Sequence, residues 1–173
     1  MAGSLIRIGS ATAGGSSATL SITGIDSTYN VYMVQVQNIV PASDDTIGWR
    51  ITKGGAIQSD SNYDNVRQDM PTTASFQDNE AQNATGVTNA DVESTGNGFF
   101  ATFYLFNFAN ASEYSLGTFE HVAYVSTPQV FGGAGAFSHT VASASDGLSF
   151  YFNGGANIAS GKLVLYGLKK WKL

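Results

Sequence analysis

The sequence predicts an all-β fold: a two-sheet antiparallel β-sandwich, jelly-roll-like, with about nine to ten strands. Three observations predict it. Short apolar runs alternate with polar residues at the period of a strand, groups of Gly, Asn, Asp and Ser separate these runs, and helical periodicity is nearly absent. A chain of 173 residues is long enough to bury one core, so we expect a single domain over residues 1–173.

The first half of the chain supplies five of these strands. In one of them, Leu20 and Ile22 share a face while Ser21 and Thr23 share the other, which is typical of a half-buried strand. The segment 29–37 has apolar residues on both faces and is expected to be central. The five expected strands are 5–8, 19–23, 29–37, 47–52 and 62–67.

The second half supplies the remaining strands. The segment 99–108 is the most apolar of the chain, and its aromatic content and short length favour a strand over a helix. Gly132, Gly133 and Gly135 interrupt a later strand and predict a bulge or a bend at a sheet corner. The expected strands are 99–108, 116–125, 129–141, 148–152 and 162–168.

Between these halves lies a polar segment, 68–98, dominated by Asp, Asn, Gln, Thr and Ser. A strand or helix needs an apolar face to pack, and this segment has few large apolar residues. We therefore expect a long polar loop insertion at about 68–98, with room for a short helix near 74–83. Loops of this length in compact domains usually carry function or are disordered.

Composition excludes several classes of site. The absence of cysteine rules out disulfides, thiolate metal sites and cysteine nucleophiles. Only 12% of residues are charged, against a usual share of about 25%. The net charge of −5 disfavours a nucleic-acid partner, which requires a basic patch.

The only basic cluster lies in a C-terminal tail at 169–173. Two interpretations are open: the tail is merely solvated, or Lys169, Lys170, Trp171 and Lys172 contact an acidic neighbouring subunit. No apolar stretch reaches the roughly 20 residues of a membrane span, so we expect no membrane partner. Residues 1–10 lack a long apolar run, so we expect no signal peptide.

Catalytic motifs are not evident, and we expect neither an enzyme nor a cofactor or metal site. His121 and His139 are the only histidines, and metal sites need three or four converging ligands. A glycan hydrolase needs two facing carboxylates. Most acids fall in expected loops, which leaves Glu120 and Asp45 as the best candidates for this weaker alternative.

Aromatic residues offer a binding alternative. Trp49 and Tyr63 lie near expected turns, where they can stack on the faces of sugars. Aromatic residues are also enriched in cores and subunit interfaces, and that interpretation is favoured here.

Several segments resemble small β-rich virion proteins of tailed bacteriophages, described as tail-fibre-like or capsid-associated. They are LIRIGSATA at 5–13, LSITGIDSTYNVYMVQVQNIVPASDD at 20–45, GWRIT at 48–52, NYD at 62–64 and IASGKLVLYGLK at 158–169. Together they cover about a third of the chain, and the resemblance is strongest at 24–36, 62–64 and 161–169.

The resemblance implies a jelly-roll-like structural protein of the phage particle, often a homotrimer, located in the virion after synthesis in the host cytoplasm. Its leading form is a capsid cement or decoration protein that binds the major capsid protein or other virion proteins. The alternative is a tail-fibre or receptor-binding domain that recognises host-surface glycans. The resemblance carries over no active-site residue.

Overall fold

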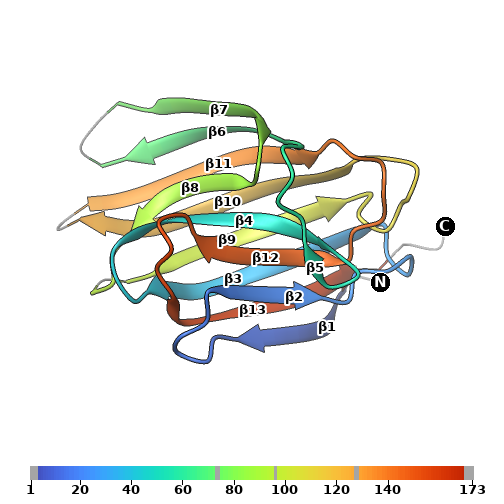
Figure 1. Cartoon of the computed structure of the whole chain (residues 1–173), viewed down its shortest axis with the longest axis horizontal. Helices are drawn as coiled ribbons and strands as arrows, with labels where there is room; N and C mark the ends of the chain where they lie inside the picture. Colours follow the sequence, from blue (N-terminus) through green and yellow to red (C-terminus); the bar gives the residue numbers. More distant parts are fainter. Residues whose placement is uncertain (1–3, 73–74, 96, 127–128, 170–173) are drawn as a thin grey trace.

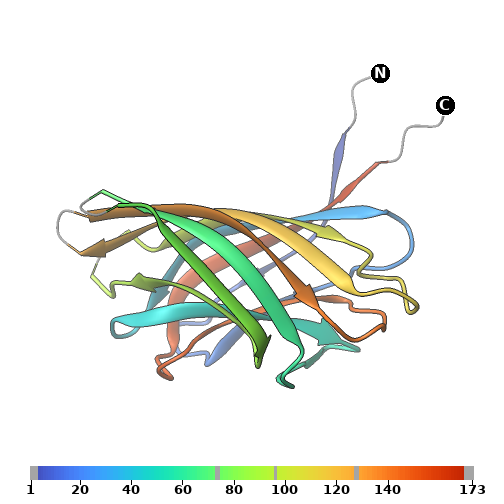
Figure 2. The same cartoon turned by 90° about the horizontal axis from the view of Figure 1, so that it is seen from above.

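The protein is a two-layer antiparallel β-sandwich, as the sequence predicts (Figures 1 and 2). The computed structural model describes residues 4–72, 75–95, 97–126 and 129–169. These ranges contain no helix and 13 strands, more than the nine or ten expected. The strands are β1 Leu5–Thr12, β2 Thr19–Thr23, β3 Val31–Pro41, β4 Asp45–Lys53, β5 Ala56–Ile57, β6 Tyr63–Pro71, β7 Gln77–Ala84, β8 Val87–Val92, β9 Phe99–Phe106, β10 Ser115–Ser126, β11 Gln129–His139, β12 Gly147–Phe152 and β13 Ile158–Leu168.

The two layers differ in size. The large sheet has eight strands in the order β1-β13-β3-β9-β10-β11-β6-β7. The small sheet has the order β2-β12-β4-β5, and β8 also pairs with β4. Figure 2 shows the large sheet as the upper layer and the small sheet as the lower one.

Eight strands follow the jelly-roll path. The ribbon β1-β13-β3-β9 faces the ribbon β2-β12-β4-β8. Along this path each strand lies in the opposite layer from the one before it, except β8, which pairs with β4 in the small sheet. Two antiparallel hairpins, β6–β7 and β10–β11, are inserted into this path and widen the large sheet beyond β9.

The polar segment 68–98 is not a loop. It holds the end of β6, all of β7 and all of β8, so the expected loop insertion and the expected short helix near 74–83 are both wrong. β7 forms the outer edge of the large sheet, where a strand can leave polar side chains in water on both faces. The polar sequence of 77–84 therefore gave no sign that this segment is a strand.

The core fills the space between the sheets. On β9 the side chains alternate strictly: Phe99, Ala101, Phe103 and Leu105 face inward and are buried. The Trp49 ring on β4 packs edge-on against the rings of Phe103 and Phe119, with centroids 5.0 and 4.8 Å away. Apolar side chains from both sheets join one continuous cluster.

The glycines of β10 and β11 make room for these rings. A Cβ on Gly117 would lie 2.3 Å from the Phe137 ring, and one on Gly135 would lie 2.6 Å from the Phe119 ring. The β10–β11 ladder runs in register through Gly132, Gly133 and Gly135. The expected bulge is therefore absent there, and Gly133 and Gly135 instead allow close packing against neighbouring side chains.

Candidate functional site

Trp49 and Tyr63 are both completely buried, at 0% exposure. The Tyr63 hydroxyl donates to the Gln58 carbonyl oxygen at 2.8 Å and accepts from the Ile51 N–H at 3.1 Å. Burial raises the pKa of this phenol above its usual value of 10.0. The glycan-stacking interpretation of these two residues is wrong because neither ring presents a face to solvent.

The basic tail is described only at its first residue. Lys169 is exposed, and its N–H donates to the Ser4 carbonyl oxygen at 3.4 Å. Lys170, Trp171 and Lys172 lie outside the described residues, so their role in partner contact stays a prediction.

His121 lies in a buried polar cluster between the sheets. Its ring stacks on those of Phe99 and Phe131, with centroids 5.6 and 5.9 Å away, and its Nδ1 lies 3.5 Å from the Asn89 side-chain nitrogen. Burial, together with the nearby Arg67 cation, lowers the pKa of His121 from 6.5 to about 4. The imidazole is therefore neutral at pH 7.

The same cluster holds a buried ion pair. The Arg67 Nε donates to the Asp69 carboxylate at 2.8 Å, and the Asn79 side chain donates to the same oxygen at 2.7 Å. A second Arg67 nitrogen donates to the Thr88 carbonyl oxygen on β8 at 2.9 Å. These contacts tie the β6–β7 hairpin to the small sheet.

His139 is also buried, and its Nε2 lies 3.6 Å from a carboxylate oxygen of Asp60. Burial lowers the pKa of His139 despite this carboxylate. His121 and His139 stand on different strands with separate neighbours. Within the described ranges, no three His, Asp or Glu side chains gather as ligands for a metal ion.

The loop carboxylates hold the backbone in place. Asp45 accepts hydrogen bonds from the N–H groups of Thr46, Gly154 and Ala156, at 2.7, 2.7 and 3.0 Å. Glu120 is exposed on the outside of the large sheet. The two candidate hydrolase carboxylates therefore lie in opposite layers and do not face each other.

The most distinctive surface is the outer face of the large sheet, which the small sheet does not cover. Seven large apolar side chains on four adjacent strands are 40 to 56% exposed there. Exposed apolar patches of this extent mark interaction surfaces in folded proteins. The seven are Phe100 and Tyr104 on β9, Leu116 and Val122 on β10, Val130 on β11, and Val66 and Met70 on β6.

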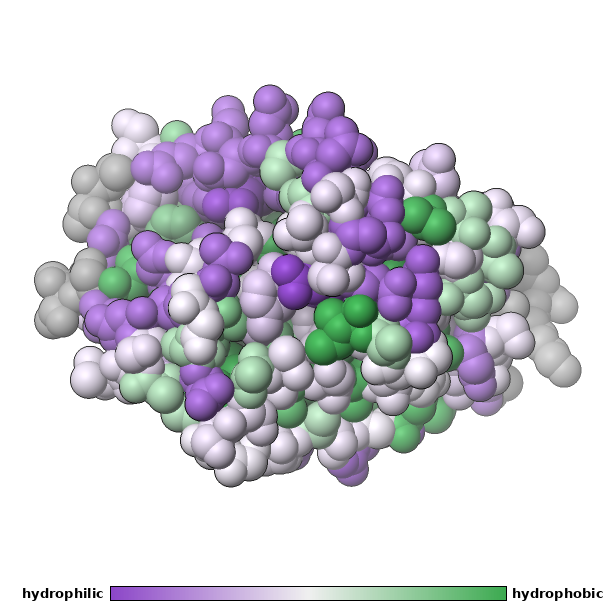
Figure 3. All heavy atoms as spheres, in the orientation of Figure 1, coloured by the Kyte–Doolittle hydropathy of each residue, from purple (hydrophilic) through white to green (hydrophobic). Residues whose placement is uncertain are grey.

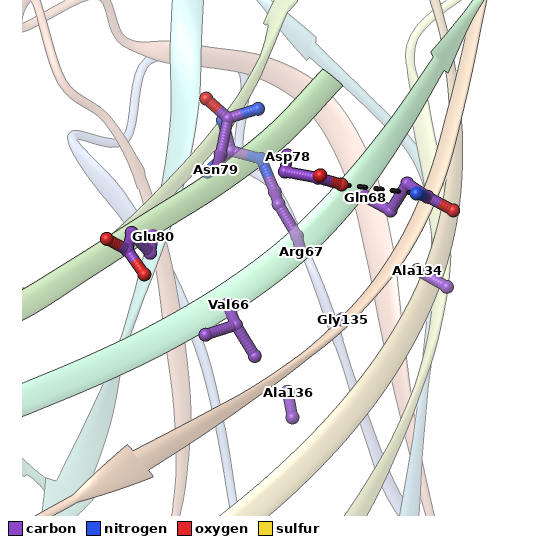
Figure 4. A pocket seen from close by; sticks show the side chains of 9 residues that line it. All are labelled: Val66, Arg67, Gln68, Asp78, Asn79, Glu80, Ala134, Gly135 and Ala136. Carbon is purple, nitrogen blue, oxygen red and sulfur yellow. Dashed lines mark hydrogen bonds between the residues drawn. The ribbon is translucent and has the colours of Figure 1, made fainter. Parts of the chain in front are cut away.

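One half of this outer face is hollowed. Small side chains on β11, chiefly Ala134 and Ala136, leave a depression of about 610 Å³ against β6 and β7. Figure 4 shows Val66 in the middle of this hollow and the hydrogen bond from Gln68 to Asp78 along one side. The other half, on β13, β3 and β9, carries bulky side chains instead: Tyr104 is exposed and Tyr166 partly exposed, with the buried Met33 between them.

The charges of the outer face are divided between its two edges. Arg7 on β1 and Lys162 on β13 lie at one edge, and Asp64, Asp78 and Glu80 on β6 and β7 lie at the other. On the opposite side of the molecule, seen in Figure 3, hydrophilic side chains also gather over β6 and β7. The β6–β7 edge is therefore polar and acidic, and the β1–β13 edge is basic.

A second unusual surface is the terminal ribbon, formed by 5–8 of β1 and 166–169 at the end of β13. Leu5 pairs with Leu168 and Arg7 with Tyr166, and a register shift follows between Arg7 and Gly9. Irregularities of this kind bend a strand, and Figure 2 shows the ribbon rising away from the two layers. Leu5, Ile6 and Ile8 are exposed on it.

Sequence reasoning missed both surfaces. The available signal was the presence of apolar residues on both faces of 99–108, where the outward-facing Phe100 and Tyr104 alternate with the buried set. A strand with two apolar faces is either covered on both or leaves one for a partner. Only the order of strands shows that the small sheet covers one face alone.

Two further findings concern the chain as a whole. None of the described segments is a helix able to cross a membrane. No protein-family model matches the chain, and no curated protein matches it either.

Proposed function

We propose that the protein is a non-enzymatic structural subunit of a tailed-phage particle, in the first place a cement or decoration protein of the capsid. The single observation that carries this proposal is the terminal ribbon, which exposes Leu5, Ile6 and Ile8 away from the core. Beyond Tyr166 and Gly167, which still pair with β3, the ribbon consists of two strands only. Two strands alone are at best marginally stable in water, so a partner that covers this end adds stability to it.

The charge of the ribbon indicates what covers it. Arg7 and Lys169 are exposed there, and the residues that follow in the sequence are Lys170, Trp171 and Lys172. An apolar strip bordered by cations fits a partner surface that is apolar with an acidic rim, because interfaces bury apolar centres and match charges at their edges. We assign this role to the major capsid protein or another virion protein.

The test is binding to particles from which the protein has been removed. The double substitution Leu5→Ser with Ile6→Ser removes two apolar side chains, each worth about 1.5–3 kcal/mol when fully buried. Even if the partner buries Leu5 and Ile6 only in part, the double variant should bind the particles at least about tenfold more weakly in co-sedimentation. Ile57→Ser, on β5 of the small sheet, is the matched control because Ile57 is similarly exposed.

The binding of the two variants distinguishes a role of the terminal ribbon from a general loss of structure. Loss of particle binding in the double variant, with the control unchanged and both variants folded by circular dichroism, supports the proposal. Full binding by the double variant contradicts the role of the ribbon. A variant lacking 169–173 then asks whether the basic tail contributes, and undiminished particle occupancy would exclude it.

A further inference from the structure

We infer that the outer face of the large sheet binds the same face of a second copy, in a two-fold pair whose axis runs parallel to the strands between β9 and β10. Three observations carry this inference: the order of charges across the sheet, the division into a hollow and a bulky half, and the area of the face. It shares one residue, Arg7, with the terminal ribbon of the proposed function, whereas Tyr104 and Glu80 lie outside that ribbon.

The charges fix the direction of the pair. One unbroken row of paired residues crosses all eight strands: Arg7, Tyr166, Met33, Tyr104, Thr118, Ala136, Val66 and Glu80. A cation stands at one end of this row and an anion at the other. The ion pairs between described residues join Arg67 to Asp69 and Asp60 to His139, so Arg7 and Glu80 take part in neither.

The axis lies at the middle of this row. Four strands stand on each side of the boundary between β9 and β10. A two-fold axis along that boundary places β1 of one copy over β7 of the other, and therefore Arg7 opposite Glu80, twice in each pair. The alternative axis, perpendicular to the strands, places each edge over itself and sets like charges opposite one another.

Shape agrees with the same axis. The operation lays Tyr166 over Val66, so the partly exposed Tyr166 side chain of each copy enters the hollow of about 610 Å³ on the other. Met33, which is only 7% exposed, lies over Ala136 without projecting. In the next row, Glu120 of β10 comes opposite Thr102 of β9, whose hydroxyl can donate to the carboxylate. The terminal ribbon, to which Arg7 belongs, rises on the side of the outer face (Figure 2).

The face is also large enough. Eight strands spaced about 4.8 Å apart, each contributing about seven residues, present roughly 800 Å². Standard stable interfaces bury about 800 Å² on each partner. Two sheets packed face to face align within about 30° of each other, as the layers of a sandwich do.

Charge reversal tests the pairing. Sedimentation equilibrium of the full chain should give twice the mass of 18.2 kDa, or an even multiple of it. Arg7→Glu alone and Glu80→Arg alone should each weaken the pair about tenfold, because each change sets two like-charge contacts in the pair. The double variant Arg7→Glu with Glu80→Arg should restore the wild-type dissociation constant.

The apolar centre has its own test. Tyr104→Glu places one negative charge from each copy in the apolar centre of the interface, beside the axis. Sedimentation equilibrium of this variant should therefore give only the mass of a single chain. Ile57→Glu, on the small sheet, is the control and should keep the wild-type mass. Circular dichroism of each variant shows that it is folded.

Every outcome bears on the inference. Restoration by the double variant supports it. A wild-type protein of single-chain mass at about 100 μM, a purely trimeric protein, or a double variant as weak as the single ones would overturn it. A monomeric protein that still binds particles would overturn this inference alone and leave the proposed function standing, whereas a dimer absent from particles would do the reverse.

Discussion

His121 shows how its surroundings in the fold, burial first and the Arg67 cation second, set a pKa that the sequence could not reveal. Alternation along β10 puts His121 on the same face as Phe119, and both side chains face the core. The sequence did not show that Phe99, Phe131 and Asn89 surround it. Those neighbours lie on three other strands, β9, β11 and β8, and they surround His121 only because of the order in which the strands pair and the layers pack.

The lowered pKa of His121 makes stability fall with acid. The folded pKa of about 4 is below the ordinary 6.5, so the unfolded chain binds the extra proton in between. The stabilisation is complete above pH 6.5 and is lost as the pH falls toward 4, by about 3 kcal/mol in total. Urea unfolding at several pH values measures this loss.

His121→Phe is the matched variant, because a phenyl ring keeps the stacking on Phe99 and Phe131. Between pH 6.5 and 4, we expect its free energy of unfolding to fall by about 3 kcal/mol less than that of the wild type. His139, whose pKa is also lowered, remains in both proteins and keeps part of the slope. Equal slopes in the two proteins would contradict the burial argument.

At the scale of elements, ten of the 13 strands were predictable, and three were not: the short β5, the edge strand β7, and β8, which lies in the same polar segment as β7. Nine of the ten expected strands lie inside or largely over β1 to β4, β6 and β9 to β12, and the segment 162–168 matches the end of β13. β7 has no apolar face that a sequence pattern could reveal, because it is the outermost strand of the large sheet and its side chains are exposed or half-buried. Its existence depends on pairing with β6, a contact that no local pattern encodes.

The β6–β7 hairpin depends on the buried carboxylate of Asp69. Asp69→Ala leaves the Arg67 guanidinium and the Asn79 amide without their acceptor, so we expect a loss of about 3 kcal/mol in the free energy of unfolding. Hydrogen exchange should rise first in β6 and β7, because the remaining large-sheet strands keep their partners.

Asp78→Ala is the control on the same hairpin. Asp78 is exposed and accepts a single side-chain hydrogen bond, from Gln68, so its loss should cost less than about 0.5 kcal/mol. If both variants lose the same stability, or if exchange rises evenly over the whole sandwich, the hairpin does not behave as a separate unit.

At the scale of the whole molecule, two inserted hairpins give the jelly roll a broad sheet face that the small sheet does not cover. The β6–β7 and β10–β11 hairpins widen the large sheet well beyond the small sheet, and they add the hollow, much of the apolar surface and the acidic edge. The sequence indicated the fold class and the low charge. It could not indicate this face, because the face exists only where strands distant in sequence lie side by side.

The central claim is that the protein is a structural part of a phage particle, and its location and copy number in purified particles test that claim most directly. Cryo-electron microscopy of intact particles should show many copies over the capsid shell, each contacting a virion protein through the terminal ribbon of Leu5 to Ile8 and its pairing strand. A few copies at one vertex would place it in the tail and support the tail-fibre alternative. Purified particles that lack the protein would contradict the account.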